Sequence, residues 1–266
     1  MHHPKFGLAV LAIFRNEAHV LREWLNHYQQ FGVEHFYLIN NNSSDGYEAV
    51  LKPYIKSGVV ELSHCQKDGN QIGAYSALLP KLKSETRWLG VFDLDEFVYS
   101  PYHDTITEVV AGFCDYEAVL IPWLSFGSSG HIRQPQSVVQ GFQRRGVSDT
   151  NRSFFKAISQ PMSIQHLSQH NPRTIRGKKV LANGVEFGDQ EYLILSEEDI
   201  GSYKLINNHY RLQSLDYFAT IKTCRPEVHE DLRDRPKKLE FFNEHDRFWN
   251  VVKDDGLARR SAAIKI

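Results

Sequence analysis

Short apolar runs alternate with helical patterns over the first 92 residues, and this alternation restricts the possible folds more than any other feature. Residues 6–14 form a continuous apolar run, which is typical of a strand covered on both faces of a parallel sheet. Apolar residues then recur at helical spacing between residues 17 and 31, and Gly32 provides a stop signal. We therefore expect a strand followed by a helix.

The same unit recurs further along the chain. Strands are expected at residues 35–39, 59–62 and 88–92, and helices at residues 47–55 and 70–82. Three such strand–helix units in about 90 residues predict an α/β fold, in which a mostly parallel, Rossmann-like sheet carries helices on both faces. Ligands bind such sheets at the carboxyl ends of the strands.

Polar clusters occupy these strand ends. Arg15, Asn16 and Glu17 follow the first expected strand, residues 40–45 the second, and residues 93–95 the fourth. The fold would bring together clusters that are far apart in the sequence, so we expect a pocket at this edge of the sheet.

The acidic cluster is the most specific of the three. If the strand continues through it, Asp93 and Asp95 project to one side while Leu94 points into the protein. Two carboxylates on one side suit a hard divalent cation, which can stabilise a departing diphosphate. Solvated acids at a strand end are the alternative interpretation of so short a motif.

The second half of the chain is harder to interpret and predicts a smaller mixed region. Asp104 or Thr105 could cap a helix that ends at Gly112, and Ser214 could cap another. Further strands are expected at residues 118–121, 138–144, 153–158 and 203–207. We expect residues 1–100 and 101–266 to be two halves that pack as a single domain.

Composition excludes several classes of protein. With 266 residues, of which 41% are hydrophobic, the chain can bury a large core. Its formal net charge of -1 lacks the basic excess of a nucleic-acid-binding domain. Cys65, Cys114 and Cys224 fit neither a disulfide framework nor a zinc site, and favour a reducing, cytoplasmic setting.

No apolar stretch is long enough for a transmembrane helix, because the longest, residues 8–14, is far short of the ~20 residues required. The basic end, with Arg259, Arg260 and Lys265, could contact anionic lipid at the inner face of a membrane. A solvated tail is the alternative.

Taken together, the motifs resemble a known family. The pieces that carry the resemblance are residues 15–18, 23–24, 32–37, 42–46, 71, 74–75, 93–97, 123, 126–131, 156, 209–211, 214 and 222. In this order they resemble GT-A glycosyltransferases, and particularly the family 92-like branch of the family 2-related enzymes.

The resemblance implies a transfer of a sugar from a nucleotide diphosphate sugar, usually uridine-linked, to a hydroxyl of a glycan or lipid-linked acceptor, with Mn²⁺ or Mg²⁺. It implies that Asp95 is the main metal ligand, that Asp93 contacts the ribose or the metal, and that His209 completes the metal or diphosphate site. An imidazole ligand favours Mn²⁺ over Mg²⁺. A packed core histidine is the alternative for His209.

The resemblance also implies a donor pocket. The residues that it assigns to the nucleoside, ribose or diphosphate are Arg15, Asn16, Glu17, Asn41, Ser43, Asp45, Gln71 and Lys156. Arg152 could share the diphosphate with Lys156, and a surface ion pair is equally compatible with either residue. Asn40 to Asn42 stand where related enzymes often have an acid, although amides can also bind a uracil edge or a ribose.

A catalytic base must lie outside the acidic cluster, because a carboxylate bound to a dication has a lowered pKa. In an inverting mechanism this base takes the proton of the acceptor hydroxyl. Asp149 is the first candidate, and Glu186, Glu191 and Asp216 follow. Each of these acids could equally be a solvated surface group.

Two further interpretations stay open. The aromatic residues Trp123, Phe126, Phe248 and Trp249 could form a platform under a sugar ring or could simply belong to the core. The protein as a whole could be a nucleotide-sugar-binding module without catalysis. A phosphohydrolase of the haloacid dehalogenase type also places two aspartates after a strand. There the pair lies near the amino terminus and a Thr or Val commonly follows it, whereas here it follows the fourth expected strand and precedes Glu96 and Phe97.

Overall fold

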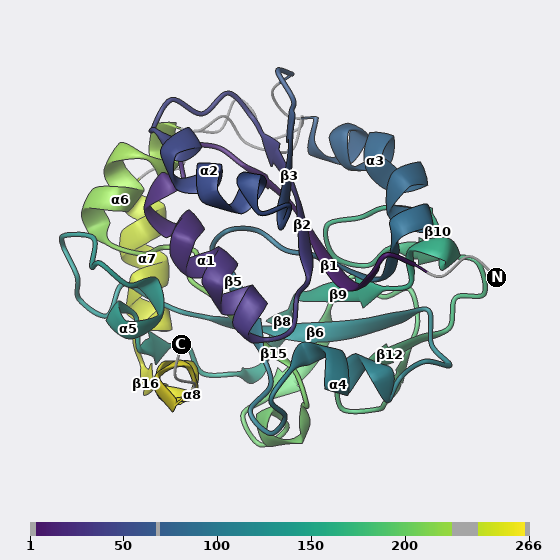
Figure 1. Cartoon of the computed structure of the whole chain (residues 1–266). Coiled ribbons are helices and arrows are strands. Elements are labelled where there is room, and N and C mark those ends of the chain that lie inside the picture. Colours follow the sequence, from purple (N-terminus) through teal and green to yellow (C-terminus); the bar gives the residue numbers. More distant parts are fainter. Residues whose placement is uncertain (1–3, 68–69, 225–238, 264–266) are drawn as a thin grey trace.

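One sheet of ten strands forms the centre of the protein in the computed structural model. The structure describes residues 4–67, 70–224 and 239–263, and for residues 149–152, 224 and 263 it describes the backbone alone. Eight strands follow one another in the order β13-β12-β6-β9-β4-β1-β2-β3, and β15 and β5 join beside β6 (Figure 1). The α/β fold class expected from the sequence is confirmed.

The first part of the chain forms the expected strand–helix units. Its elements are β1 (Phe6–Phe14), α1 (Ala18–Gln30), β2 (His35–Asn40), α2 (Tyr47–Lys56), β3 (Val60–His64), α3 (Gln71–Glu85), β4 (Thr86–Val91), β5 (Glu96–Tyr99) and α4 (Ile106–Ala111). Strand β1 pairs in parallel with β2 on one side and with β4 on the other. The carboxyl ends of these strands therefore lie at one edge.

Helices cover both faces of this sheet, as the continuous apolar strands predict. Alternate residues of β1, such as Leu8 and Val10, belong to the core under α1 and α2. Its other residues, such as Ala9 and Leu11, belong to a second core under α3. Figure 1 shows α1 and α2 on one side of β1 and β2, and α3 on the other.

The second part of the chain contains short strands and helices. Its elements are β6 (Ala118–Ser125), α5 (Val138–Gly141), β7 (Arg144–Arg145), β8 (Asp149–Ser153), β9 (Phe155–Ser159), β10 (Ile164–His166), β11 (Arg173–Thr174), β12 (Lys179–Leu181), β13 (Glu186–Phe187), β14 (Leu193–Ser196), β15 (Ile206–His209), α6 (Leu215–Thr220), α7 (Leu239–Trp249), β16 (Val252–Lys253) and α8 (Gly256–Ala263). Three 3₁₀ turns, at Pro161–Ser163, Ile200–Ser202 and Lys222–Cys224, complete the set in the described residues.

Strands from the two parts of the chain alternate in the sheet. β9 lies antiparallel between β4 and β6, and β15 pairs with β5 and with β6. His209, at the end of β15, is thereby brought next to the turn between β4 and β5. The sequence does not reveal this neighbourhood, because β5 and β15 are about a hundred residues apart.

Both helix caps expected from the sequence are confirmed. The Thr105 side chain accepts a hydrogen bond from the backbone N–H of Glu108 and forms a capping box with it. Ser214 accepts from the backbone N–H of Tyr217 at the start of α6.

Two expectations about the second half are wrong. Residues 138–144 were expected to form a strand, but Val138–Gly141 is a helical turn because Ser137 caps it and the carboxylate of Glu23 accepts hydrogen bonds from the N–H groups of Val138 and Val139. The strand expected at residues 203–207 begins only at Ile206. Helices α7 and α8 carry no cap signal that we recognised in the sequence.

We predict a loss of stability in mild acid that depends on His27. The ring of His27 is buried and its Nε2 donates to the carbonyl of Val98 at 2.8 Å, and burial lowers its pKa from 6.5 to about 4. Between these two pKa values the unfolded chain binds more protons, so the contribution is complete above pH 6.5 and is lost as the pH falls toward 4. The stability lost by pH 4 amounts to roughly 3 kcal/mol.

Urea unfolding of the wild type and of His27→Gln at several pH values measures this effect. Glutamine keeps a hydrogen-bond donor but does not titrate, so the variant should lose less stability on acidification. His103→Gln, which changes an exposed histidine, serves as the control and should behave as the wild type. Equal acid sensitivity of His27→Gln and the wild type would contradict the assignment.

Candidate functional site

The polar ends of β1 and β2 meet, as the sequence predicts. The backbone N–H of Asn16 donates to Ser43 Oγ at 3.0 Å, and Asn16 Oδ1 accepts from the N–H of Ser44 at 2.8 Å. Asp45 Oδ2 accepts from the N–H of Ala18 at 2.7 Å, at the start of α1. Three predicted donor-site residues, Asn16, Ser43 and Asp45, therefore bind the two loops to each other.

The remaining predicted nucleoside residues lie at the same edge. Asn41 donates its amide to the carbonyls of Cys65 and Lys67, at 2.8 and 3.3 Å, and so holds the loop after β3 in place. Glu17 is buried, and its backbone carbonyl accepts the N–H groups that begin α1. Arg15 is half-buried beside it. The structure thus brings the predicted donor residues together along one rim.

The acidic motif does not continue strand β4. The strand ends at Val91, Leu94 and Asp95 form a turn, and β5 begins at Glu96. Leu94 is buried, as expected. The expectation that Asp93 and Asp95 lie on one side of a strand is wrong, because the turn directs each carboxylate to a different lysine.

Asp93 belongs to a cluster around Lys156. The Lys156 ammonium lies 2.8 Å from Asp93 Oδ2 and 3.3 Å from Glu96 Oε2, and Lys156 is fully buried. Gln71 donates to the hydroxyl of Tyr75 at 2.8 Å and lies 3.5 Å from Asp93 Oδ1. Two predicted donor residues, Gln71 and Lys156, thus contact the first aspartate of the motif.

Burial and charge act in opposite directions in this cluster. Burial alone would lower the pKa of Lys156, but the carboxylates of Asp93 and Glu96 raise it, so the lysine is charged at neutral pH. Burial raises the pKa of Glu96 well above its usual value. Glu96 Oε2 accepts the N–H of Asp93 at 2.9 Å and fixes the turn from within.

Asp95 belongs to a second cluster, with Lys222 and His209. Lys222 Nζ lies 2.5 Å from Asp95 Oδ2, and His209 Nε2 lies 3.5 Å from Asp95 Oδ1. Burial opposes ionisation of Asp95, but the charge of Lys222 and the contact with His209 outweigh it and hold its pKa well below the usual value. Burial lowers the pKa of His209, so its imidazole is neutral and its contact with Asp95 is not an ion pair at neutral pH.

The Asp95 cluster fits a divalent cation in its donor atoms. A neutral imidazole and an ionised carboxylate are both metal ligands, and two atoms that bind one such ion at about 2.0–2.2 Å can lie as far apart as Asp95 Oδ1 and His209 Nε2 do. Within the described residues, no group of three or more His, Cys, Asp or Glu side chains is arranged to hold a metal. Small dications commonly use one or two carboxylates together with substrate phosphates, so a set of two protein ligands is not an obstacle.

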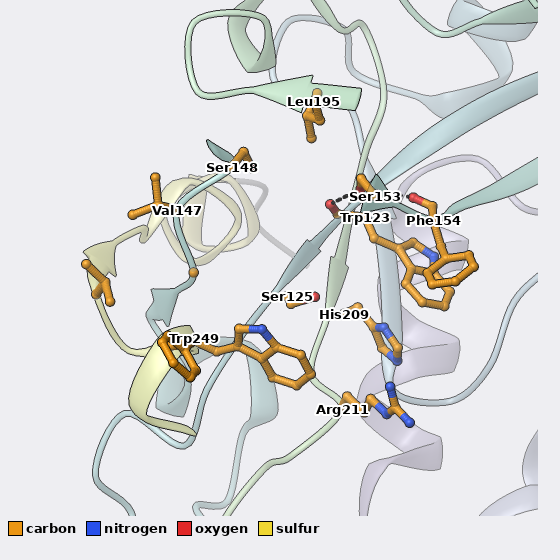
Figure 2. Close-up of a pocket in the computed structure, with 13 residues that line it drawn as sticks. Trp123, Ser125, Val147, Ser148, Ser153, Phe154, Leu195, His209, Arg211 and Trp249 are labelled. Carbon is orange, nitrogen blue, oxygen red and sulfur yellow. Dashed lines mark hydrogen bonds between the residues drawn. The ribbon is translucent and has the colours of Figure 1, made fainter. Parts of the chain in front are cut away.

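A pocket of about 410 Å³ opens beside His209. Figure 2 shows Trp123 and Phe154 on one side of it, Trp249 on the other, and His209 and Arg211 between them. The pocket is lined by Trp123, Ser125, Gly146, Val147, Ser148, Ser153, Phe154, Leu195, His209, Arg211, Phe248, Trp249 and Val251. His209 therefore belongs both to the Asp95 cluster and to the wall of the pocket.

Three of the four aromatic residues considered as a platform for a sugar ring lie at the pocket. Trp123, Phe248 and Trp249 line the pocket, but Phe126 is fully buried and packs against Tyr210 in the core. Residues 126–131, part of the family resemblance, hold helix α7, because the Asp246 carboxylate accepts hydrogen bonds from the N–H and the hydroxyl of Ser128 at 2.6 and 2.8 Å.

Asp149 as the catalytic base stays a prediction. The backbone of Asp149 begins β8 and pairs with Ser196 of β14. Ser153, at the other end of β8, and Leu195, next to Ser196, line the pocket. The side chains of Asp149 and Arg152 lie outside the described part of the structure. None of Glu186, Glu191 and Asp216 lines the pocket.

Sequence reasoning missed the roles of Glu96 and Lys222. Glu96 directly follows the acidic motif, and its full burial could not be inferred from composition. Lys222 lies just beyond α6 and was part of the resemblance, but nothing in the sequence pairs it with Asp95, which is 127 positions away. Phe154 and Leu195 were missed because β8 and β14 pair across about forty residues of chain, and no local signal predicts such a pairing.

The basic end of the chain is partly paired. Arg259 lies 2.6 Å from Asp255, and Arg260 lies 2.7 Å from Asp104. Lys265 is outside the described residues. A search of the described helices found none with the length and apolar character needed to cross a membrane.

Comparison with known proteins identifies relatives over most of the chain. The family model of glycosyltransferase family 92 matches residues 6–248. A family 92 protein of Ricinus communis is 30% identical over 167 residues, which cover 53% of this chain and 27% of that protein. A family 92 protein of Oryza sativa subsp. japonica is 24% identical over 231 residues, 80% of this chain and 34% of that protein.

The galactan β-1,4-galactosyltransferase GALS3 of Arabidopsis thaliana is 25% identical over 175 residues, 59% of this chain and 35% of that protein. The chain thus spans about a third of the length of the curated relatives it matches. Among solved structures, S. aureus TarS 1-349 is 12% identical, with a TM-score of 0.44 over 70% of this chain and 59% of that chain.

We predict that Lys222 stabilises the protein mainly by compensating the charge of Asp95. Lys222→Met leaves a buried carboxylate without its cation, and should cost roughly 3–5 kcal/mol in the free energy of unfolding. Adding Asp95→Asn should recover much of the loss because the uncompensated charge is gone. Urea unfolding of the wild type, both single variants and the double variant measures this coupling.

An exposed ion pair provides the comparison. Lys81 and Glu61 lie 2.6 Å apart but are about 40% exposed, so Lys81→Met should cost less than about 1 kcal/mol. If Lys222→Met is no more damaging than Lys81→Met, the buried pair does not have the assigned role.

Proposed function

The chain belongs to glycosyltransferase family 92, and from this membership we propose that it transfers a sugar from a nucleotide diphosphate sugar, UDP-linked, to a hydroxyl of a glycan acceptor. One observation supports the proposal most directly. The carboxylate cluster at the sheet edge and the aromatic pocket share His209, so a donor diphosphate at Asp95 and an acceptor in the pocket would be neighbours. Family membership makes a haloacid dehalogenase-type phosphohydrolase untenable.

The donor would occupy the rim formed by the ends of β1, β2 and β4. Arg15, Asn16 and Glu17 of the first strand end, with Asn41, Ser43 and Asp45 of the second, are proposed to surround the nucleoside. Gln71, Asp93 and Lys156 lie together at the end of β4 and are proposed to face the ribose and the diphosphate. Because Lys156 and Lys222 compensate the two aspartates, a diphosphate would not meet an uncompensated pair of negative charges.

We propose Mn²⁺, or alternatively Mg²⁺, as the cofactor, bound by Asp95 and His209 with Asp93 nearby. The ion would supply positive charge for the departing diphosphate. The chain's own contribution is to keep Asp95 ionised through Lys222 and to keep the His209 imidazole neutral by burial. The neutral imidazole favours Mn²⁺.

Inverting transfer needs a base for the acceptor hydroxyl, and Asp149 stays our proposal for this role. What supports it is the position of its strand, since the paired strands β8 and β14 carry Ser153 and Leu195 at the pocket. Asp93 and Asp95 are poorly suited, because both carboxylates are paired with lysines.

The similarity to a galactan β-1,4-galactosyltransferase favours a glycan over a lipid-linked saccharide as the acceptor, and makes galactose the first donor sugar to test. Synthesis of a cell-surface polysaccharide, the cytoplasmic location and a peripheral membrane contact stay predictions.

We predict that the protein hydrolyses a UDP-sugar slowly when Mn²⁺ is present and no acceptor is added. Asp95→Ala and His209→Ala should abolish this hydrolysis, measured as release of UDP, and should remove the Mn²⁺-dependent thermal stabilisation by UDP. Asp115→Ala, at an exposed position, is the control and should retain both. Undiminished hydrolysis by Asp95→Ala, or full activity in a metal chelator, would refute the metal assignment.

We predict that Asp149→Asn loses transfer but still binds the donor. Removal of a general base typically costs about 10²–10⁴-fold in kcat. Thermal shifts with UDP and Mn²⁺ should match the wild type, because Asp149 is not assigned to the donor site. Wild-type protein that binds a UDP-sugar but neither hydrolyses nor transfers it would instead indicate a binding module, and an unchanged kcat in Asp149→Asn would exclude this residue as the base.

A further inference from the structure

We propose that the 410 Å³ pocket beside His209 binds the terminal sugar of the acceptor, and that this sugar is an uncharged hexose that stacks on Trp249. The proposal deepens the proposed function and rests on it for the identity of the bound sugar as the acceptor. Its support comes from the walls of the pocket, from its charged groups and from the way in which the carboxy-terminal segment is held.

The walls of the pocket are largely aromatic. Trp123 and Phe154 stand on one side, and Trp249 at the end of α7 stands opposite (Figure 2). Phe248, which precedes Trp249 in α7, also belongs to the lining. A pyranose ring presents C–H groups on its faces and hydroxyls at its rim, so it can stack on an aromatic ring while its edge makes hydrogen bonds. The distribution of groups in this pocket matches that division.

The polar side chains of the pocket are hydroxyls and an imidazole, with one exception. The hydroxyls belong to Ser125, Ser148 and Ser153, and the imidazole belongs to His209. Ser153 Oγ lies 3.2 Å from the carbonyl of Trp123 and 3.1 Å from that of Phe154, which fixes the position of its oxygen. Among the side chains that the structure describes, the pocket lining includes no carboxylate that could bind a cationic sugar.

Arg211 is the exception, and it does not make the pocket a site for an acidic sugar. Its guanidinium lies over the ring of Phe241, 5.0 Å from the ring centroid, and its backbone carbonyl accepts a hydrogen bond from Lys222. Arg211 is thus already engaged in holding α7 and the Asp95 cluster. A carboxylate in the pocket would gain this one cation but would lose its hydration against walls that are largely aromatic, so we favour a neutral hexose over a uronic acid.

The Trp249 wall is held rigidly. The N–H of Gly127 donates to the carbonyl of Trp249 at 2.9 Å, and a Cβ atom at Gly146 would lie 3.1 Å from Trp249 Cδ1. A side chain at position 146 would therefore require the indole to shift by a few tenths of an ångström. A wall that is already in place before the ligand arrives costs less conformational entropy on binding.

A buried arginine holds the same segment from behind. Arg145 donates to Asp254 at 2.7 Å and forms a second ion pair with Glu197, which also accepts the N–H of Ser148 at 3.0 Å. The carbonyl of Arg145 accepts the N–H of Val251 at 3.1 Å. Three segments that line the pocket, at residues 146–148, 195 and 249–251, thus converge on Arg145.

The position of the pocket makes it suitable for an acceptor. His209 lies at its floor, with its ring 4.3 Å from that of Trp123 between centroids, and its Nε2 faces Asp95. A hexose stacked on Trp249 would therefore present its far edge toward the proposed donor diphosphate. Loss of the stacking surface should affect the acceptor and not the donor.

The test compares Trp249→Ala and Trp249→Phe with the wild type. Saturation-transfer NMR with methyl galactoside, methyl glucoside and the methyl glycoside of galacturonate, whose carboxylate is free, measures binding of the sugar without any need for turnover. Release of UDP from UDP-galactose without acceptor measures the donor site alone, and transfer to a galactan oligosaccharide measures the complete reaction. Tyr102→Ala, an exposed aromatic residue outside the pocket, is the control.

We expect a neutral methyl hexoside to bind the wild type and the galacturonate to bind more weakly. Trp249→Ala should lose this signal and raise the acceptor KM at least about tenfold, whereas Trp249→Phe should keep most of both. Donor hydrolysis should stay within about twofold of the wild type in both variants.

The outcomes separate this proposal from the proposed function. Hexoside binding that depends on Trp249, in a protein without any hydrolysis or transfer, would support the pocket and refute the proposed function. Hydrolysis without hexoside binding, an equal loss of hydrolysis and transfer in Trp249→Ala, or preferred binding of the galacturonate would overturn the proposal about the pocket.

Discussion

The contact on which the site depends is the buried ion pair between Asp95 and Lys222, at 2.5 Å. It joins the turn between β4 and β5 to the segment after α6, and the imidazole of His209 at the end of β15 completes it. A buried carboxylate without a partner would be strongly unfavourable, so these segments are held together or the turn cannot form as it does. The same contact sets the ionised state of Asp95, on which the proposed chemistry depends.

A second lysine repeats this arrangement on the other side of the motif. Lys156, on β9, is charged and fully buried against Asp93 and Glu96. Each aspartate of the motif therefore has its own cation, supplied by a different part of the second half of the chain. The two halves cannot be separated without removing those cations, which explains why the site and the mixed second half form one structure.

Local patterns were sufficient for the first half of the fold and for two caps. Strand β1 matches its expected range because nine apolar residues in a row have few other stable positions. Thr105 and Ser214 were predictable because a cap is a local hydrogen bond. Residues 138–144 were misassigned because the carboxylate that favours the helix there belongs to Glu23, more than a hundred residues away.

The sequence by itself determined the order of strands and helices over the first 92 residues, the edge of the sheet where polar residues gather, and the acidic motif at that edge, since all three follow from short-range patterns. Only the tertiary structure decided which lysine meets which aspartate, that His209 belongs to both the acidic cluster and the pocket, and that Trp249 closes the pocket opposite Trp123. These contacts join residues that lie far apart in the chain. Their partners depend on how the strands are ordered in the sheet, and no local pattern encodes that order.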